Sequence, residues 1–303
     1  MNEILKNYEL DIIKIVELNK GYSANKWIIE TKTKKYILKE ENTSELRMKY
    51  ILYIIENIKD ITASVIKTKN NCNYVSYNNK LYYLMDYIDS QDIDKIFSNK
   101  KYYNLGIFLG KLHNKLSTLN KYQDSYLDFN DNYNVLNKYL KDAEDNNYIE
   151  YIEILKYKIS ILNELDISKI DLTKLSSQIV HGDFYIDNVL YDDRFKVIDF
   201  DQSCNFYKEY EVLRAMFLIC LSNDYKSSLT NMKEFMHGYL QFNVINSPED
   251  SYNLYLYVQA NSLSSLKKEH YKNDEKRKFA LKRYNILKFL VQEKENIIKI
   301  LSI

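Results

Sequence analysis

Proline and glycine are scarce in this chain: one proline and five glycines occur in 303 residues, against usual shares of about 5% and about 7%. The overall composition, with 46% apolar and 28% charged side chains, excludes fibrous and disordered classes and is typical of a globular protein. Tyrosine is abundant instead, with 30 copies. Because lysine, asparagine and isoleucine are abundant too, we interpret the tyrosines as the drift of an AT-rich genome rather than as a functional signal.

Cysteines and long apolar runs are also few. Cys72, Cys204 and Cys220 are odd in number and widely spaced, so they fit neither a disulfide framework nor a zinc site. Residues Met1–Asp11 carry acids early and lack the ~7–15-residue apolar stretch of a secretory signal. The longest strongly apolar run, Ala215–Leu221, has seven residues, whereas a membrane helix needs about 20. We therefore expect a cytoplasmic protein with reduced cysteines and no membrane partner.

Neither sign of charge dominates, since 43 basic side chains face 42 acidic ones and leave a formal net charge of +1. This balance excludes an acidic tail protein and provides no overall basic field for nucleic acid or an anionic membrane. No repeat of about 20–50 residues is visible, which argues against a solenoid. The length suffices for one large domain or two small ones, and the oligomeric state stays open.

The hydrophobic pattern changes character near residue 89. Before it, short β-rich runs alternate with turn residues, and one helical pattern covers Thr43–Asn57 with Thr43 or Ser44 as its candidate cap. The β-rich runs are Ile12–Leu18, Trp27–Thr31, Lys35–Lys39, Ser64–Thr68, Tyr74–Tyr77 and Leu81–Tyr87. We predict a small lobe with a five-stranded sheet over residues 1–88.

After residue 89 the apolar spacing is mostly helical. Leu105, Leu109 and Leu112 mark one amphipathic helix. Further helices are expected over residues 131–144, 148–165, 207–222, 226–243, 250–267 and 272–301. The exception is Ile179–Phe200, which reads as loop, strand, turn and strand. The pattern therefore predicts a large, mainly helical lobe over residues 89–303 with a β insert.

One segment carries the strongest chemical signal. Residues 180–190 read Val-His-Gly-Asp-Phe-Tyr-Ile-Asp-Asn-Val-Leu, and residues 197–201 read Val-Ile-Asp-Phe-Asp. Phosphoryl transfer depends on in-line positioning and charge neutralisation, and Mg²⁺ takes oxygen ligands. Asn188 and Asp199 have the right side chains for such a metal. Asp183 could orient an acceptor hydroxyl and take its proton.

His-x-Asp-x4-Asn followed by Ile-Asp-Phe-Asp resembles the aminoglycoside phosphotransferase/choline kinase group of the protein-kinase-like superfamily. The resemblance implies an α+β, protein-kinase-like bilobal fold. Its small antiparallel-sheet N-lobe, residues 1–88, would bind the nucleotide. Its large, mainly helical C-lobe, residues 89–303, would carry the catalytic loop and the substrate site. The implied activity is transfer of the γ-phosphate of ATP or GTP, with Mg²⁺, to a hydroxyl of a small molecule.

The resemblance also implies a lysine on the third strand that holds the α- and β-phosphates. Residues 36–39, Tyr-Ile-Leu-Lys, have that form and make Lys39 the candidate. A glutamate on the following helix should pair with this lysine. Glu45 is the first candidate because its helical spacing places it on the buried face. The alternatives are Glu40, Glu41 and Glu56.

Two further segments would contact the nucleotide. Gly21 opens the turn that would cover the phosphates, with backbone N–H groups around Ser23 facing phosphate oxygens. Protein kinases have three glycines in this loop, and here only one is present. Residues 82–88 resemble the last small-lobe strand and hinge. There the Asp86 carbonyl and the Ile88 amide would bind adenine, and Met85 would line the pocket.

The acceptor is the least determined part. Residues 202–303, where this group selects its acceptor, contain 15 Lys and Arg but 11 Asp and Glu. A site for a polycationic aminoglycoside would gather carboxylates, so this balance argues weakly against that class. Choline, homoserine, thiamine, sugars and other antibiotics stay open as substrates. An aromatic cage for a quaternary ammonium is conceivable there, although its many aromatic residues are more typical of helix packing.

Two other classes of kinase-like protein are alternatives to a small-molecule kinase. One is a catalytically inert, kinase-like structural protein, as in spore-coat members of the superfamily. Such proteins often lose a metal ligand or the lysine, whereas this chain keeps Lys39, Asp183, Asn188 and Asp199. The other is a protein kinase, and no Ala-Pro-Glu segment follows Asp199. Both observations favour the small-molecule enzyme.

Overall fold

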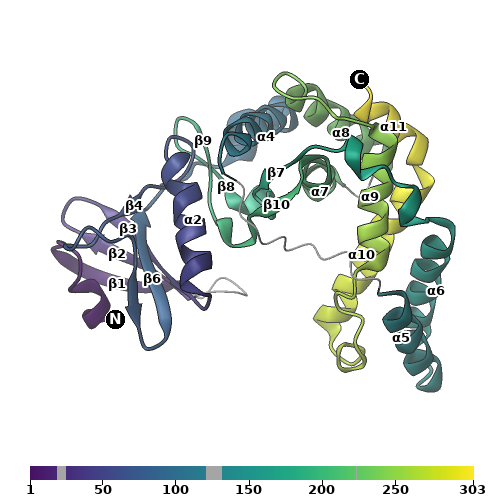
Figure 1. The fold of residues 1–303 in the computed structure, drawn as a ribbon, viewed down its shortest axis with the longest axis horizontal. Helices are drawn as coiled ribbons and strands as arrows, with labels where there is room; N and C mark the ends of the chain where they lie inside the picture. The colour runs from purple at the N-terminus through teal and green to yellow at the C-terminus, as the bar shows by residue number, and fades with distance from the viewer. Residues whose placement is uncertain (19–24, 121–131, 223) are drawn as a thin grey trace. The chain divides into compact units, whose positions relative to one another are not determined.

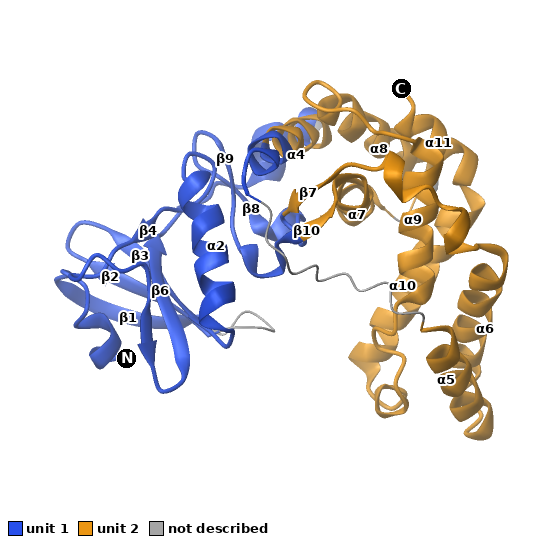
Figure 2. Ribbon diagram, viewed as in Figure 1, with its two compact units in different colours: residues 1–101, 112–122, 181–204 blue, residues 102–111, 123–180, 205–303 orange. Residues whose placement is uncertain are grey.

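The computed structural model describes residues 1–18, 25–120, 132–222 and 224–303 (Figure 1). The chain divides into two compact units, coloured separately in Figure 2. The first unit contains residues 1–101, 112–122 and 181–204, and the second contains residues 102–111, 123–180 and 205–303. A lobe boundary between residues 88 and 89 stays a prediction.

The first unit is built on an antiparallel sheet in the order β1-β2-β3-β6-β4, with β5 also paired to β6. Its helices and strands are α1 (Asn2–Leu5), β1 (Ile12–Leu18), β2 (Lys26–Thr31), β3 (Lys35–Glu41), α2 (Glu45–Asn57), β4 (Val65–Ile66), β5 (Val75–Tyr77), β6 (Lys80–Asp86), α3 (Ile93–Phe97), β8 (Val189–Tyr191) and β9 (Phe195–Val197). The last two form a separate antiparallel hairpin.

The sheet has six strands, so the predicted number of five is wrong by one. Val65 of β4 is opposite Met85, and Val75 of β5 is opposite Tyr82. The two short strands therefore share one edge of β6, each covering part of its length, while β3 covers the other edge. Six strands occupy five positions across the sheet.

Alternation along the strands gives the sheet two different faces. Leu38 of β3 is opposite Leu84 of β6, and both belong to an apolar core that includes Ile4 and Leu5 of α1. Their strand neighbours project to the other face. Successive residues of β3 therefore alternate between the apolar core on one face of the sheet and the opposite face, which is available for a ligand.

Helix α2 begins as its sequence predicts. The Ser44 hydroxyl accepts a hydrogen bond from the Arg47 N–H at 3.2 Å, which identifies Ser44 rather than Thr43 as the N-cap. Met48, Ile51 and Ile55 are buried along one face of the helix. The cap and the apolar spacing together fix where this helix starts and which face it buries.

The second unit is mainly helical, with one short pair of strands. Its elements are residues 102–111 of α4 (Lys101–Ser117), then α5 (Tyr133–Asp145), α6 (Ile149–Glu164), β7 (Ser177–Val180), β10 (Cys204–Tyr207), α7 (Lys208–Cys220), α8 (Tyr225–Tyr239), α9 (Pro248–Asn261), α10 (Asp274–Gln292) and α11 (Lys294–Leu301). The helix expected over 272–301 is two helices, with the break at Glu293. None of the described helices is both long enough and apolar enough to span a membrane.

Helices α4 and α8 approach each other closely at two glycines. A Cβ on Gly106 would lie 2.0 Å from the carbonyl oxygen of Phe235, and a Cβ on Gly238 would lie 2.0 Å from that of Tyr103. Any larger residue at either position would require the two backbones to separate. Glycine is therefore a packing requirement at this crossing.

Candidate active site

Lys39 is the centre of a buried charge cluster in the first unit. Its side chain is 2% exposed, and its Nζ lies 2.8 Å from Glu41, 2.8 Å from Asp199 and 2.5 Å from Asp201. Burial alone would lower the pKa of Lys39, but Tyr83 and the three carboxylates hold that pKa well above the ordinary lysine value. Lys39 is therefore a permanently charged group.

Two of the carboxylates around this lysine, Asp199 and Asp201, have pKa values shifted in opposite directions. Burial alone would raise the pKa of Asp199, but Lys39 and Lys26 hold it below the ordinary aspartate value. Burial raises the pKa of Asp201 to about 7, and the charges of Asp199 and Glu41 add to this effect against the attraction of Lys39. Asp199 therefore stays ionised at neutral pH. As the pH falls, Asp201 takes up a proton before Asp199 does.

The structure corrects the prediction that Glu45 pairs with Lys39. The Glu45 side chain is 60% exposed and lies 3.7 Å from Lys49 on the same helix. Glu41 takes the expected place, from the end of β3 itself rather than from α2. Glu40 is engaged elsewhere, by Lys80, Tyr82 and Asn25. The glutamate partner of Lys39 thus comes from its own strand.

Arg47 explains why Glu45 points outward. Arg47 occupies the buried position in the first turn of α2 and is 4% exposed. Its Nη2 donates to the backbone carbonyls of Asp201 at 2.7 Å and of Ser203 at 2.5 Å. Helix α2 therefore holds the segment that follows Asp199 through a guanidinium, and its first residue is left at the surface.

A second lysine reaches the cluster, and no sequence motif indicated it. Lys26 begins β2 directly opposite Lys39 on β3. Its Nζ lies 2.9 Å from Oδ2 of Asp199, while Lys39 contacts Oδ1 of the same carboxylate. The signal that could have found Lys26 is the register of the β2–β3 hairpin, because opposite residues share a face of the sheet.

The loop before Asp183 is shaped by a glycine. Gly182 has φ +80°, a backbone conformation that favours glycine. A Cβ at Gly182 would also lie 2.1 Å from the carbonyl oxygen of Gln202. The second position of the His-Gly-Asp motif therefore admits no side chain, for two independent reasons.

His181 connects the two halves of the motif. Its Nδ1 accepts a hydrogen bond from the Asp183 N–H at 3.2 Å, and its Nε2 lies 3.0 Å from the carbonyl oxygen of Ile198. Because Nδ1 accepts, Nε2 must carry the proton and donate, so the ring is the neutral Nε2–H tautomer. His181 is a buried brace between the loop of Asp183 and the residue before Asp199.

Asn188 orients Asp183 in turn. Its Nδ2 donates to Oδ2 of Asp183 at 3.0 Å and to the Asp183 backbone carbonyl at 2.9 Å. The Asn188 carbonyl accepts from the Ile198 N–H at 3.0 Å, which ties it to the strand end before Asp199. With its nitrogen directed to Asp183, the amide oxygen is the Asn188 side-chain atom suited to a metal. An amide oxygen and an ionised carboxylate fit Mg²⁺.

Asp199 is held in an unusual backbone conformation. Its φ is +71° and its ψ is +70°, in the left-handed region. A non-glycine residue there costs on the order of 1–3 kcal/mol and persists only where its surroundings impose it. The contacts of Lys26 and Lys39 with its carboxylate are part of those surroundings. Backbone strain of this kind is frequent at functional sites, so it agrees with the choice of Asp199 as a candidate site residue.

A cavity of about 310 Å³ lies beside the charge cluster, a size typical of small-ligand sites. Met85, Asp86 and Ile88 all line it, together with Lys26, Lys39 and Asp199. The other lining residues are Leu18, Ile37, Ala63, Tyr87, Asp89, Ser90, Leu190 and Ile198. The cavity thus has an apolar wall and one charged end.

The hinge segment offers this cavity a backbone donor. The Asp86 N–H donates to Ser64 at 3.0 Å, and the Tyr87 N–H donates to Lys35 at 3.2 Å. Among the described residues, the Ile88 N–H has no hydrogen-bond partner. An N–H without a protein partner in a cavity lining can donate to a ligand, so an acceptor such as a purine ring nitrogen suits this position.

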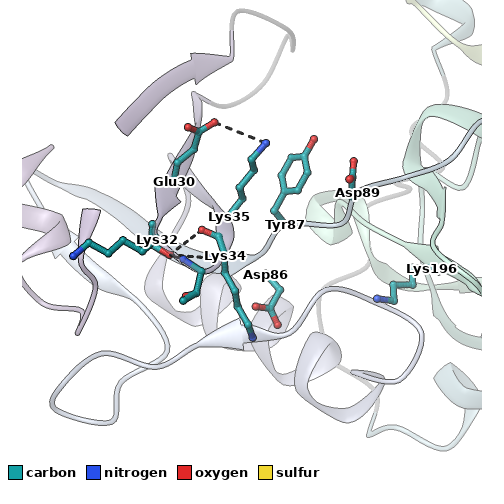
Figure 3. Close-up of a pocket in the computed structure, with 10 residues that line it drawn as sticks. Glu30, Lys32, Lys34, Lys35, Asp86, Tyr87, Asp89 and Lys196 are labelled. Carbon is teal, nitrogen blue, oxygen red and sulfur yellow. Dashed lines mark hydrogen bonds and ion pairs between the residues drawn. The ribbon is translucent and has the colours of Figure 1, made fainter. Parts of the chain in front are cut away.

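A second, larger cavity of about 600 Å³ lies outside the hinge, where Figure 3 shows its lysine side chains. Lys32 and Lys34 come from the β2–β3 turn, Lys35 begins β3, and Lys196 comes from β9. It shares Asp86, Tyr87 and Asp89 with the smaller cavity but is lined by none of the charge cluster. The smaller cavity is therefore the candidate active site.

Two predicted nucleotide contacts, Gly21 and Ser23, lie outside the described residues. Their roles stay predictions.

Comparison with known proteins matches most of this sequence to one family. A family model described as the phosphotransferase enzyme family matches residues 14–226, well over half of the chain. No sequence among the curated proteins matches significantly.

Solved structures support the fold at low sequence identity. A spectinomycin phosphotransferase in complex with ADP and spectinomycin is 15% identical, with a TM-score of 0.60 over 95% of each chain. An aminoglycoside phosphotransferase from Alicyclobacillus acidocaldarius is 14% identical, with a TM-score of 0.65 over 98% of this chain and 96% of the other. A choline kinase from Cryptosporidium parvum is 14% identical, with a TM-score of 0.62 over the same shares. The predicted kinase-like fold is confirmed.

Proposed function

Because the chain belongs to the phosphotransferase enzyme family, we propose that it is a small-molecule kinase. It transfers the γ-phosphate of ATP or GTP to a hydroxyl group of a small molecule. The observation that carries this proposal is the contact of Lys39 with Asp199, at 2.8 Å, beside the 310 Å³ cavity. In kinases a lysine binds the nucleotide phosphates and a nearby ionised aspartate binds Mg²⁺. Lys39 and Asp199 have the side chains and the proximity for these two roles.

The nucleotide base occupies the apolar part of the cavity. Met85 lines it, and the Ile88 N–H is available as a donor to the base. Lys39 then reaches the phosphates from the charged end. Neighbours of the same fold were solved with ADP or AMP, which supports nucleotide use by this chain.

Asn188 and Asp199 are the residues that would hold Mg²⁺. Both present oxygen atoms, and the low pKa of Asp199 keeps its carboxylate ionised and ready to bind. Mg²⁺ commonly takes one or two protein ligands and completes its shell with phosphate and water. When bound, it neutralises phosphate charge during transfer.

Asp183 is the proposed catalytic base. Its carboxylate is fixed by the Asn188 amide at 3.0 Å, and its backbone N–H is fixed by His181. The acceptor oxygen forms its bond to the γ-phosphorus as the bond to the bridging oxygen of the nucleotide breaks. The hydroxyl proton passes to Asp183, and the nucleoside diphosphate leaves with the bridging oxygen.

The acceptor is a hydroxyl-bearing small molecule. Neighbours named for spectinomycin, aminopropanol and choline share this fold, and each of those acceptors carries both a hydroxyl and a cationic nitrogen. We therefore place amino alcohols and aminocyclitols first in a panel, followed by homoserine, thiamine and sugars.

The test is a nucleotide-consumption screen of this panel with ATP and with GTP, and Asp183→Asn serves as the matched inactive variant. We expect at least one acceptor to stimulate nucleotide consumption, with formation of a phosphorylated product that the variant does not make. Consumption that no acceptor changes, or that Asp183→Asn retains in full, would contradict the proposal.

A further inference from the structure

Lys26 and Lys39 contact the two oxygens of one carboxylate. The Nζ of Lys26 is 2.9 Å from Oδ2 of Asp199, and the Nζ of Lys39 is 2.8 Å from Oδ1. The two lysines are directly opposite on β2 and β3, so they project from the same face of the sheet. Both line the 310 Å³ cavity. The sheet register therefore delivers two cations to the charged end of this cavity.

The two lysines are not held equally. Lys39 is 2% exposed and contacts Glu41 and Asp201 in addition to Asp199. Lys26 is 22% exposed, and in the part of the chain that the structure describes its one carboxylate partner is Asp199. Moving Lys39 would leave the buried carboxylates around it without their cationic partner, which is strongly unfavourable. Lys26 can leave Asp199 at much smaller cost, because Lys39 still neutralises that carboxylate.

A divalent metal on Asp199 competes with this arrangement. Mg²⁺ binds an oxygen lone pair at about 2.0–2.1 Å, and each oxygen of Asp199 already accepts an ammonium group. A lysine and a metal on the same oxygen repel each other as like charges. Since Lys39 is locked in place, Oδ2 becomes available to a metal when Lys26 moves away.

We propose that Lys26 is an exchangeable phosphate-binding residue. It neutralises Asp199 in the nucleotide-free protein, and it transfers to a phosphate oxygen of the nucleotide when the metal takes Oδ2. The inference rests on the nucleotide-binding function proposed above. The flexible four-carbon stem of lysine permits this transfer inside a cavity that Lys26 already lines. Asp199 and the arriving phosphate each keep a cationic partner throughout.

The first measurement is calorimetric titration of the full chain with ADP and with GDP in excess Mg²⁺. Lys26→Met is compared with Lys34→Met, because Lys34 belongs to the same hairpin but lines the neighbouring cavity. Loss of a charged hydrogen bond to phosphate should weaken binding of the preferred nucleotide about tenfold or more in Lys26→Met. Lys34→Met should bind like the wild type.

The second measurement uses the metal alone. Free Mn²⁺, as a stand-in for Mg²⁺, is followed by electron paramagnetic resonance during titration without nucleotide. Lys26→Met removes the competing ammonium from Asp199, so we expect Mn²⁺ to bind at least about threefold more tightly than in the wild type. One substitution then strengthens metal binding and weakens nucleotide binding, a pair of opposite changes that damage to the fold does not produce.

The outcomes separate the two hypotheses. If the wild type binds a nucleoside diphosphate and Lys26→Met binds it equally well, the exchange is overturned while the proposed function stands. Unchanged Mn²⁺ affinity in Lys26→Met also overturns the exchange. If the wild type binds neither ADP nor GDP, the proposed function fails and the role of Lys26 fails with it. Should Lys26→Met not fold, Lys26→Gln removes the charge but retains a donor for Asp199, and the same two opposite changes are required of it.

Discussion

Lys158 in α6 is a buried cation that should make the stability of the protein depend on pH. It is 6% exposed, and its Nζ donates to the backbone carbonyl of Gln259, in the last turn of α9, at 2.6 Å. Burial, with the nearby charge of Arg283, lowers the pKa of Lys158 to about 7 from the usual 10.5. The folded protein therefore releases this proton at a much lower pH than the unfolded chain does.

The direction and size of the effect follow from proton linkage. Between about pH 7 and pH 10 the unfolded chain holds a proton on Lys158 that the folded protein lacks, so raising the pH favours the folded state. Below pH 7 both states are protonated and the contribution becomes constant at its least favourable value. From pH 7.5 to pH 9.5 this lysine alone should raise the free energy of unfolding by about 2–3 kcal/mol.

The assay is urea unfolding at several pH values from 7.0 to 9.5, for the wild type, Lys158→Met and Lys156→Met. Lys156 lies on the same helix but is exposed, with Glu144 as its partner, so it is the matched control. Tyrosines of the unfolded chain, whose pKa is about 10, begin to ionise toward pH 9.5 and lower the stability of all three proteins. The contribution of Lys158 is therefore the difference between the pH dependences of the wild type and Lys158→Met. From pH 7.5 to pH 9.5 we expect the free energy of unfolding of the wild type and of Lys156→Met to gain about 2–3 kcal/mol relative to that of Lys158→Met. Parallel pH dependences in all three proteins would refute a buried, low-pKa lysine at this site.

Three substitutions test the catalytic loop. Asp183→Asn should reduce turnover of an identified acceptor by roughly 10²–10⁴-fold and leave Mg·ADP or Mg·GDP affinity near wild type, and wild-type turnover would remove Asp183 from the mechanism. Asn188→Ala should lower both turnover and Mg²⁺-dependent nucleotide affinity, because it removes a proposed metal ligand and the donor that holds Asp183. Unchanged calorimetric affinity would show that Asn188 does not hold the metal. Gly182→Ala adds a Cβ 2.1 Å from the Gln202 carbonyl at a residue with φ +80°, so its Tm should fall by about 4 °C or more, and a wild-type Tm would mean that the loop relaxes freely.

The parts of the candidate site whose proximity follows from the sequence are local. Asp183 and Asn188 are five residues apart, and one short loop is enough to bring their side chains within 3.0 Å. The cap and the apolar spacing of α2 are local too, which is why a cap at Thr43 or Ser44 and the buried face could be predicted. In such short segments the turn residues leave the backbone few conformations that connect the two neighbouring elements.

The partners of Lys39 were not predictable in the same way. Asp199 and Asp201 lie 160 and 162 residues away along the chain, and their contact depends on how the segment after β9 meets the end of β3. Helical spacing correctly indicated a buried face in α2, but it could not tell that Arg47 would reach backbone carbonyls there and leave Glu45 outside. The left-handed backbone of Asp199 leaves no trace in the residue type.

Lys26 was missed for a related reason. An isolated lysine at the start of a strand has no distinguishing pattern, and its importance emerges only from the pairing that places it opposite Lys39. Knowing the strands is therefore not enough, since a shift of the hairpin by one residue would turn Lys26 to the opposite face of the sheet.

The glycines of this chain indicate positions at which substitution by a larger residue is poorly tolerated. Glycine is rare in this chain, with five copies in 303 residues, so each copy that is present is informative. Three of the four glycines in the described residues, Gly106, Gly182 and Gly238, would place a Cβ within 2.1 Å of a backbone carbonyl oxygen, and Gly110 would place one at 3.0 Å. In a glycine-rich homologue the same positions would be lost among many permissive ones. Because glycine is rare here, its described positions in the sequence mark the places where two backbone segments approach most closely.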